Sequence, residues 1–216
     1  MADTTRIEFY FDCASAFSYI GFEFMEKYRA LWNIQVDYRP FVLEKVMANA
    51  QNSFSPFKLP HLFQDLRRTS SITGIPFKGI PAQYPYDPII ALRTLQFIKT
   101  HHAEKLPEAM RKLWLMEYVE RRAPRSISDV KQALQGVVDE SLVDQAMALA
   151  DTLEAVDANT ARITELKGFG APTILAYREG SDKPQLFFGS DRFEHLAIYL
   201  EREFHPMRQL FANAKL

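Results

Sequence analysis

The chain is poor in cysteine and carries almost no net charge. A single cysteine, Cys13, among 216 residues excludes an intrachain disulfide and fits a reducing compartment. The formal net charge of −1 argues against the basic surface by which proteins bind nucleic acids or anionic membranes. No apolar run reaches the about 18 residues of a transmembrane helix, and the N-terminus lacks the apolar segment of a signal peptide. We therefore expect no nucleic-acid partner and no membrane span.

Apolar and aromatic residues, by contrast, are plentiful. The chain is 47% hydrophobic, with 17 phenylalanines and 9 tyrosines. A chain of this length can bury a sizeable core in one large domain, or in a domain that carries an insertion.

The N-terminal forty residues predict a strand, a helix and a second strand. Alternating apolar residues predict the strands and apolar residues at helical spacing predict the helix, over 6–13, 16–31 and 34–39. Asn33 ends the helix and Pro40 stops the second strand. A strand, a full helix and a strand in this order predict parallel strands with a right-handed crossover.

The middle of the chain predicts helices and no strands. A short helix is expected over 43–50, and the stretches rich in Pro, Asn, Ser and aromatics at 51–60 and 76–88 are expected to be loops. The remaining periodic segments are expected to be helices over 61–72, 88–102, 104–121, 128–137 and 141–167.

Strand patterns return near the C-terminus. Two apolar runs at 173–177 and 185–188 flank a turn at 179–182, and an amphipathic helix follows over 191–204. The order βαβ, helices, ββα predicts an α/β fold: a thioredoxin-like core split by an all-helical insert. We expect the thioredoxin-like domain to comprise residues 1–55 and 168–216, and the helical domain residues 56–167.

Serines stand where this kind of fold usually keeps its reactive sulfur. The turn between the first strand and its helix commonly carries Cys-x-x-Cys, but here it carries Ser15 and Ser18. Serine at a helix start also serves as an ordinary N-cap. If the position is functional, the reactive thiol must arrive with a ligand.

Two further segments would meet this turn in the fold. Ala171-Pro172 precedes the third strand, where a cis-proline packs against the reactive turn. Ser190 and Asp191 would begin the last helix, placing a carboxylate beside free backbone N–H groups. Together these segments predict a site for glutathione: its thiol at Ser15, its cysteinyl backbone along Ala171-Pro172, and its γ-glutamyl end at Ser190 and Asp191.

The expected energies are large enough to ionise the bound thiol. A helix N-terminus stabilises an anion by about 0.3–2 kcal/mol, and a hydroxyl hydrogen bond to a charged acceptor adds about 1.5–3 kcal/mol. Together they would lower a thiol pKa of about 8.5 by about 1–3 units. Ser15 would therefore donate a hydrogen bond to the thiolate and would not itself be a nucleophile.

The chain resembles the kappa-class glutathione transferases in segments that span nearly its whole length. The matching segments are Phe9-Tyr10-Phe11-Asp12, Ser15-x-x-Ser18, Gly21-Phe22-Glu23, Trp32-Asn33-Ile34, Arg39-Pro40, Asn52, Gly168-Phe169-Gly170-Ala171-Pro172 and Phe188-Gly189-Ser190-Asp191-Arg192. The family is related to the 2-hydroxychromene-2-carboxylate isomerases.

The resemblance implies a homodimeric enzyme with Ser15 as its catalytic residue. It also implies glutathione as co-substrate, without a metal. The implied glutathione contacts are Ser15, Ala16, Phe17, Asn52, Lys58, Ala171, Pro172, Ser190, Asp191 and Arg192. The family usually has Ser-Pro-Tyr-Ser followed by Trp, and often Leu before the cis-proline. Here Ala16, Tyr19 and Ala171 depart from that pattern.

The sequence leaves three functions open. The first is a detoxifying transferase that activates glutathione as a thiolate against small hydrophobic electrophiles or peroxides. The second is a glutathione-dependent cis–trans isomerase of the hydroxychromene-carboxylate type. The third is a non-catalytic module that binds glutathione or a protein partner.

Cys13 and the five histidines have simpler interpretations. Free cysteines are commonly buried, so a structural role for Cys13 is favoured over a mixed disulfide with glutathione. The histidines show no ligand spacing, and no metal is expected. The aromatic stretch from Phe54 to Tyr86 is expected to form the electrophile pocket and a dimer surface.

The C-terminal tripeptide resembles a targeting signal. Ala214-Lys215-Leu216 has the small-basic-Leu form of a peroxisomal signal, although three residues can arise by chance. The resemblance supports this interpretation, because the kappa-class family is associated with peroxisomes and mitochondria. A peroxisomal location is expected, with the mitochondrion and the cytoplasm as alternatives.

Overall fold

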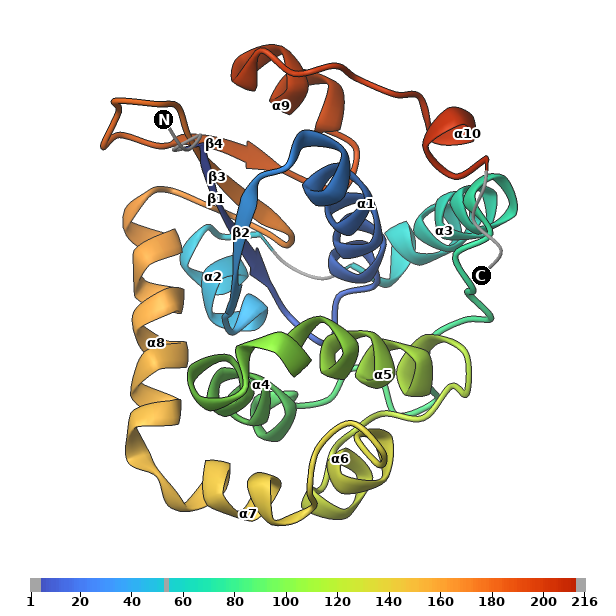
Figure 1. The fold of residues 1–216 in the computed structure, drawn as a ribbon. Helices are drawn as coiled ribbons and strands as arrows, with labels where there is room; N and C mark the ends of the chain where they lie inside the picture. Colours follow the sequence, from blue (N-terminus) through green and yellow to red (C-terminus); the bar gives the residue numbers. More distant parts are fainter. Residues whose placement is uncertain (1–4, 53–54, 213–216) are drawn as a thin grey trace.

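Four strands form one mixed sheet at the centre of the computed structural model, which describes residues 5–52 and 55–212 (Figure 1). The strands are β1 (Arg6–Phe11), β2 (Gln35–Pro40), β3 (Thr173–Tyr177) and β4 (Gln185–Phe188), in the spatial order β2-β1-β3-β4. β1 pairs parallel to β2 and antiparallel to β3, and β3 pairs antiparallel to β4. The expected βαβ unit and C-terminal hairpin are confirmed, and with them the fold class.

Helices enclose the sheet on both faces. They are α1 (Ala16–Trp32), α2 (Leu43–Asn49), α3 (Leu59–Thr73), α4 (Ile89–His101), α5 (Leu106–Tyr118), α6 (Ile127–Ala133), α7 (Ser141–Ala148), α8 (Ala150–Glu165), α9 (Phe193–Leu200) and α10 (Met207–Leu210), with single 3-10 turns η1 (Pro56–Lys58) and η2 (Ala103–Lys105). In Figure 1, α4 to α7 lie together below the sheet, and α8 returns along one side. The division into two domains at the expected boundaries stays a prediction.

Alternate residues of β1 supply two different cores. Phe9 and Phe11 belong to the larger cluster, which includes α1 and Trp114 of the helical segment. Tyr10, which points to the opposite face, packs with Phe41 of the segment after β2 and Ile163 of α8. β1 is therefore buried on both faces, as expected of the central strand of a covered sheet.

Helix α1 begins and ends close to where the sequence predicts. Ser15 is its N-cap, and the Ser15 side chain accepts a hydrogen bond from the N–H of Ser18. Asn33 is its C-cap in the left-handed conformation, with φ of 51°. Both ends follow from local capping chemistry, which explains why the pattern locates them.

The single helix expected over 141–167 is wrong. Leu149 is extended, with φ of −90° and ψ of 122°, and separates α7 from α8. The Arg93 guanidinium of α4 donates to the carbonyls of Ala146, Met147 and Leu149 at 3.1, 2.9 and 2.9 Å. The Arg93 side chain thus donates hydrogen bonds to carbonyl groups that, in a continuous helix, would accept from backbone N–H groups of the next turn.

Other boundaries also differ from expectation. β1 ends at Phe11 and not at residue 13, because Asp12 turns to accept backbone hydrogen bonds. The loop expected over 51–60 contains η1 and the start of α3. The helix expected over 191–204 is α9, which begins at Phe193 and ends at Leu200, where Glu201 is left-handed with φ of 55°. Ser190 and Asp191 do not begin that helix, because Arg192 is its N-cap.

Candidate active site

The turn before α1 is fixed by a buried carboxylate. Asp12 is 2% exposed, and its two oxygens accept hydrogen bonds from the backbone N–H of Ala14 and of Leu43, each at 2.8 Å. The backbone N–H of Asp12 itself donates to the Ser18 hydroxyl at 3.4 Å. Asp12 therefore joins the turn to the start of α2, and Ser18 has a structural partner beneath the turn.

The helical segment holds the same turn from the other side. The Trp114 indole of α5 donates to the carbonyl of Cys13 at 3.0 Å, and the Tyr118 hydroxyl donates to it at 3.4 Å. Trp114 is fully buried and packs edge-on against Phe11 at 5.6 Å between ring centroids. The position of the turn thus depends on sheet and helical segment together.

Ser15 lies at the first turn of α1 with its donor capacity intact. Its Oγ accepts from the N–H of Ser18 at 3.1 Å, which leaves the hydroxyl proton available to a ligand. Within the described parts of the chain, the N–H groups of Ala16 and Phe17 have no hydrogen-bond partner, as is usual at a helix start. One hydroxyl and two N–H groups can therefore stabilise an anion here.

The segment before β3 lies against the start of α1. The Ala171–Pro172 peptide bond is cis, as the sequence predicts. Gly21 makes this close approach possible, since a Cβ at Gly21 would lie 2.9 Å from Cγ of Pro172. The carbonyl of Pro172 accepts from the N–H of Gly189 at 3.0 Å, which brings the segment after β4 to the same place.

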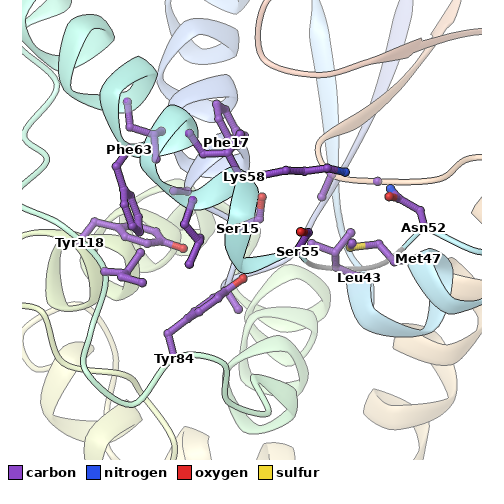
Figure 2. Close-up of a pocket in the computed structure, with 18 of the residues that line it drawn as sticks. Ser15, Phe17, Leu43, Met47, Asn52, Ser55, Lys58, Phe63, Tyr84 and Tyr118 are labelled. Carbon is purple, nitrogen blue, oxygen red and sulfur yellow. The ribbon is translucent and has the colours of Figure 1, made fainter.

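A cavity of about 310 Å³ opens in front of Ser15 (Figure 2). Its walls come from the start of α1, α2 and the residues after it, α3, the loop before α4, α5 and the loop before β3. Six of the predicted site residues line it: Ser15, Ala16, Phe17, Asn52, Lys58 and Ala171. The Asn52 amide donates to the carbonyl of Phe169 at 3.0 Å, and so joins two of these walls.

The other predicted site residues lie beside the cavity, outside its lining. Pro172 lies behind Ala171 and contacts α1, and Cβ of Ser190 would be 3.5 Å from a Cβ at Gly21. Asp191 and Arg192 form an ion pair with each other at 2.5 Å on the surface, with side chains 66% and 48% exposed. The assignment of these residues to the γ-glutamyl end of glutathione stays a prediction.

The other residues that line the cavity were not named individually by the sequence analysis. They are mostly apolar: Ala14, Leu43, Met47, Ser55, Leu59, Leu62, Phe63, Leu66, Ile80, Tyr84, Tyr118, Gly170 and Phe188. The aromatic stretch from Phe54 to Tyr86 was expected to supply a pocket, and Phe63 and Tyr84 do line it. Phe54 lies outside the described residues, and Phe57 is 93% exposed.

Buried acids lie behind the cavity. Burial raises the pKa of Asp12 to about 6, although the N–H groups of Leu43 and Ala14 oppose this shift. Burial also raises the pKa of Glu117 well above its usual range, and the nearby Asp12 adds to the shift. Glu117 accepts a hydrogen bond from the Tyr86 hydroxyl at 2.8 Å.

Cys13 is 1% exposed, and burial raises the pKa of its thiol well above its usual range, with Asp12 and Glu117 adding to the shift. A thiol that stays protonated is a poor nucleophile. The structural interpretation of Cys13 therefore agrees with its environment.

Within residues 5–52 and 55–212, no group of three or more His, Cys, Asp or Glu side chains could hold a metal ion. Over the same residues, no helix has the length and apolarity needed to cross a membrane.

Known relatives cover the chain from end to end. Glutathione S-transferase kappa 2 of Caenorhabditis elegans is 28% identical and covers 99% of this chain and 100% of its own length. Glutathione S-transferase kappa 1 of Homo sapiens is 25% identical over 97% of both chains. These matches confirm the resemblance that the motifs indicate.

Solved structures share the architecture. The structure of 2-hydroxychromene-2-carboxylate isomerase superposes with a TM-score of 0.74 at 23% identity, covering 91% of this chain and 94% of its own. The cytosolic disulfide reductase DsbM of Pseudomonas aeruginosa with GSH superposes with a TM-score of 0.63 at 16% identity, covering 91% and 97%. Both show the fold alone.

Residues 6–201 match the family described as DSBA-like thioredoxin domain. This match covers the four strands, the helical segment and the turn that carries Ser15. The chain therefore belongs to the DsbA-like thioredoxin family, with serines at the two positions where a Cys-x-x-Cys pair would stand.

Proposed function

We propose that the chain is a glutathione transferase of the kappa class, which holds glutathione as a thiolate at Ser15 for attack on a small hydrophobic electrophile. The observation that carries this proposal is the group of donors at the start of α1. The Ser15 hydroxyl and the N–H groups of Ala16 and Phe17 border an apolar cavity and are available to an anion. The names of the full-length relatives support glutathione as the source of that anion.

The walls of the cavity suit the rest of glutathione. Ala171 borders the cavity where the chain bends just before β3, and its backbone groups would pair with the cysteinyl backbone of glutathione. Figure 2 shows the Lys58 ammonium extending over the cavity toward Asn52, where it would meet a carboxylate of the ligand. Asp191 and Arg192, which form an ion pair on the surface, are the residues proposed for the γ-glutamyl group.

The test is a titration of the bound thiol by its ultraviolet thiolate absorbance. Wild-type protein saturated with glutathione should titrate about 1–3 pKa units below the free value of about 8.5. Ser15→Ala should bind glutathione within a few-fold of wild type, shift the bound thiol pKa back toward the free value, and lose most turnover near neutral pH.

Two outcomes contradict the proposal. A bound thiol that titrates as in free glutathione would indicate a binding module without activation. Unchanged turnover of Ser15→Ala in mildly acidic buffer would remove Ser15 from the mechanism. Ser18→Ala is the matched control, because the Ser18 hydroxyl faces Asp12 beneath the turn and should leave the thiol pKa in place.

A glutathione-dependent isomerase is the second candidate function. The superposition on 2-hydroxychromene-2-carboxylate isomerase, with a TM-score of 0.74, favours keeping it. An isomerase returns glutathione unconsumed, whereas a transferase consumes it in proportion to product. Measuring free thiol during turnover separates the two.

The assembly and location of the protein belong to the same proposal. A homodimer is proposed from the resemblance, and the side chain of Phe57, which is 93% exposed, supports a dimer surface. Light scattering of purified protein tests this proposal. A peroxisomal location is proposed from Ala214-Lys215-Leu216, which lies outside the described residues. A fluorescent fusion with and without this tripeptide tests it, and an unchanged distribution would rule the signal out.

A further inference from the structure

A smaller cavity shares two wall residues with the cavity in front of Ser15. Phe63 and Ile80 line both, and Phe77 adds a further apolar side chain to the smaller one, whose volume is about 170 Å³. Because a water molecule takes up about 30 Å³ of liquid, this space can hold a group of several heavy atoms. Neither Ser15 nor Lys58 lines it, so it is separate from the proposed glutathione site.

Three cationic side chains from three segments line the smaller cavity. Arg67 lies on α3, Lys78 on the segment between α3 and α4, and Arg121 on the segment that follows α5. Among the described residues, no acid lines this cavity. The whole chain has a net charge of only −1, so this basic cluster of Arg67, Lys78 and Arg121 is a local feature and not part of a generally basic surface.

The basic cluster lacks a counter-charge within the part of the chain that the structure describes. The side chains of Arg67 and Lys78 are exposed and form no hydrogen bond or ion pair there. Arg121 donates one hydrogen bond, from its Nε to the carbonyl of Ile80 at 3.4 Å, and forms no ion pair there. The donors of the cluster are therefore available to a ligand.

Two acids near the cluster in sequence are held by other cations. Asp65 pairs with Arg68 at 3.0 Å, and Glu120 lies 3.9 Å from Arg122. Like charges that are brought together without a counter-charge repel one another. An anion in the smaller cavity would remove that repulsion.

Backbone contacts hold the segments of the basic cluster in place. The N–H of Lys78 donates to the carbonyl of Tyr118 at 2.8 Å, which joins its segment to the end of α5. Arg121 has a φ of 62°, in the left-handed region that residues with a side chain seldom adopt. Together with its hydrogen bond to Ile80, this conformation places the Arg121 guanidinium beside the cavity.

We propose that the basic cluster binds the phosphate group of a small organic phosphate monoester, at a site separate from that for glutathione. Two guanidinium groups present paired N–H donors that match phosphate oxygens. Three positive charges also favour a dianion over the single charge of a carboxylate. Phe63 and Phe77 would contact the apolar part of the monoester.

Calorimetry of the full chain with phenyl phosphate at low ionic strength tests the proposal. Arg67→Gln and Lys78→Gln should each weaken binding about fivefold, as expected for the loss of one exposed charge pair. The loss should shrink at high salt. Neither side chain has a partner in the described protein, so the Tm of both variants should stay close to that of wild type. Wild-type protein that binds no phenyl phosphate would overturn the proposal.

Arg68→Gln is the matched control for Arg67→Gln. Arg68 is the next residue of the same helix, but it pairs with Asp65 and does not line the smaller cavity. Its replacement should leave the affinity for phenyl phosphate within about twofold of wild type, well below the loss of a ligand charge pair. Equal losses in the two variants would mean that the anion senses only the general charge of α3, which would overturn the site.

Two further ligands test the chemical class. Benzoate keeps the ring but carries a single charge, so it should bind about fivefold or more weakly than phenyl phosphate. Inorganic phosphate lacks the apolar part and should also bind more weakly. Equal binding of benzoate would overturn the preference for phosphate, and equal binding of inorganic phosphate would overturn the assignment to an organic monoester.

The remaining comparison separates this site from the proposed glutathione site. Saturating glutathione and the Lys58→Ala variant should each leave the affinity for phenyl phosphate unchanged. If glutathione displaces phenyl phosphate, or if Lys58→Ala weakens binding as much as Arg67→Gln does, the anion binds at the start of α1 and this inference is overturned. If the protein binds phenyl phosphate but not glutathione, the proposed function fails and this inference stands.

Discussion

The Asp12 carboxylate accepts a hydrogen bond from the backbone N–H of Leu43 at 2.8 Å, across 31 residues of sequence. Its other oxygen accepts from the N–H of Ala14, one residue before Ser15. A single side chain therefore connects the first residue of α2 to the turn that would hold the thiolate.

Replacing Asp12 with asparagine tests this connection. An amide has one oxygen and would direct its NH₂ group at the second backbone N–H, so the turn should loosen. Turnover should fall about tenfold or more, because the thiolate is no longer held in position. The glutathione KM should change less than kcat. Equal kcat in variant and wild type would contradict a positioning role.

The same variant changes the pH dependence of stability. Burial raises the pKa of Asp12 from 3.8 to about 6, so its protonated form favours folding and this stability is lost as pH rises through about 6. Asparagine does not titrate. Between pH about 4 and 7.5, the free energy of unfolding of Asp12→Asn should therefore rise by about 2.5 kcal/mol relative to that of wild type. Urea denaturation at several pH values measures it, and parallel curves would exclude the shift.

Glu117→Gln should stabilise the protein above neutral pH. Burial raises the pKa of Glu117, so the folded state favours the neutral acid, and stability falls as pH rises above the unfolded pKa. Among the described residues, its Oε1 has no hydrogen-bond partner. Glutamine keeps the acceptor for Tyr86 without a charge, so its Tm should exceed that of wild type at pH 8 and converge with it in acid.

The control for Glu117 is on the same helix. Glu108 is exposed in the first turn of α5, so Glu108→Gln should give no pH-dependent gain in Tm. If both variants show the same pH dependence, burial is not the cause.

Gly21→Ala should separate α1 from the cis-proline segment. The added Cβ would lie 2.9 Å from Cγ of Pro172 and 3.3 Å from Cζ of Phe9, both in rigid surroundings. Overpacking of this kind costs about 1–3 kcal/mol, partly offset by the roughly 1 kcal/mol helix preference of alanine over glycine. We expect a lower Tm and weaker glutathione binding by calorimetry. Unchanged affinity would show that this contact does not shape the site.

Lys58→Ala should weaken glutathione binding without affecting the thiol. The Lys58 ammonium borders the cavity, and an exposed charge pair with a ligand carboxylate contributes up to about 1 kcal/mol, or about fivefold in affinity. The loss should shrink at high salt. Lys45→Ala is the matched control, since Lys45 pairs with Asp157 at 2.8 Å and does not line the cavity. Equal effects of the two variants would remove Lys58 from the site.

Local chemistry made most of the fold predictable. The strand alternation, the cap at Ser15 and the left-handed end at Asn33 depend on neighbours within a few residues. The break at Leu149 depends on Arg93, which lies 56 residues away in sequence, so no local pattern reveals it. The start of α9 was misplaced because Ser190 and Asp191 have good capping side chains that the chain does not use as caps.

The candidate site was predictable to the extent that its residues belong to a motif. Ser15 and Ala171 stand at positions set by the order of strands and helices. Tyr84 stands in a loop, and only the packing of that loop against the turn brings its hydroxyl to the cavity. Asp12 lies within a recognised segment, but its role depends on Leu43, which only the fold brings near.

The bond from Trp114 to the carbonyl of Cys13 has a consequence for motion. A lid must swing free of the group that it covers, yet α5 is anchored to the turn that carries Ser15. A rotation of α5 away from this turn would break the bond to Cys13 and displace Ser15 with it. We therefore expect ligands to enter and leave while α5 stays in place against the turn.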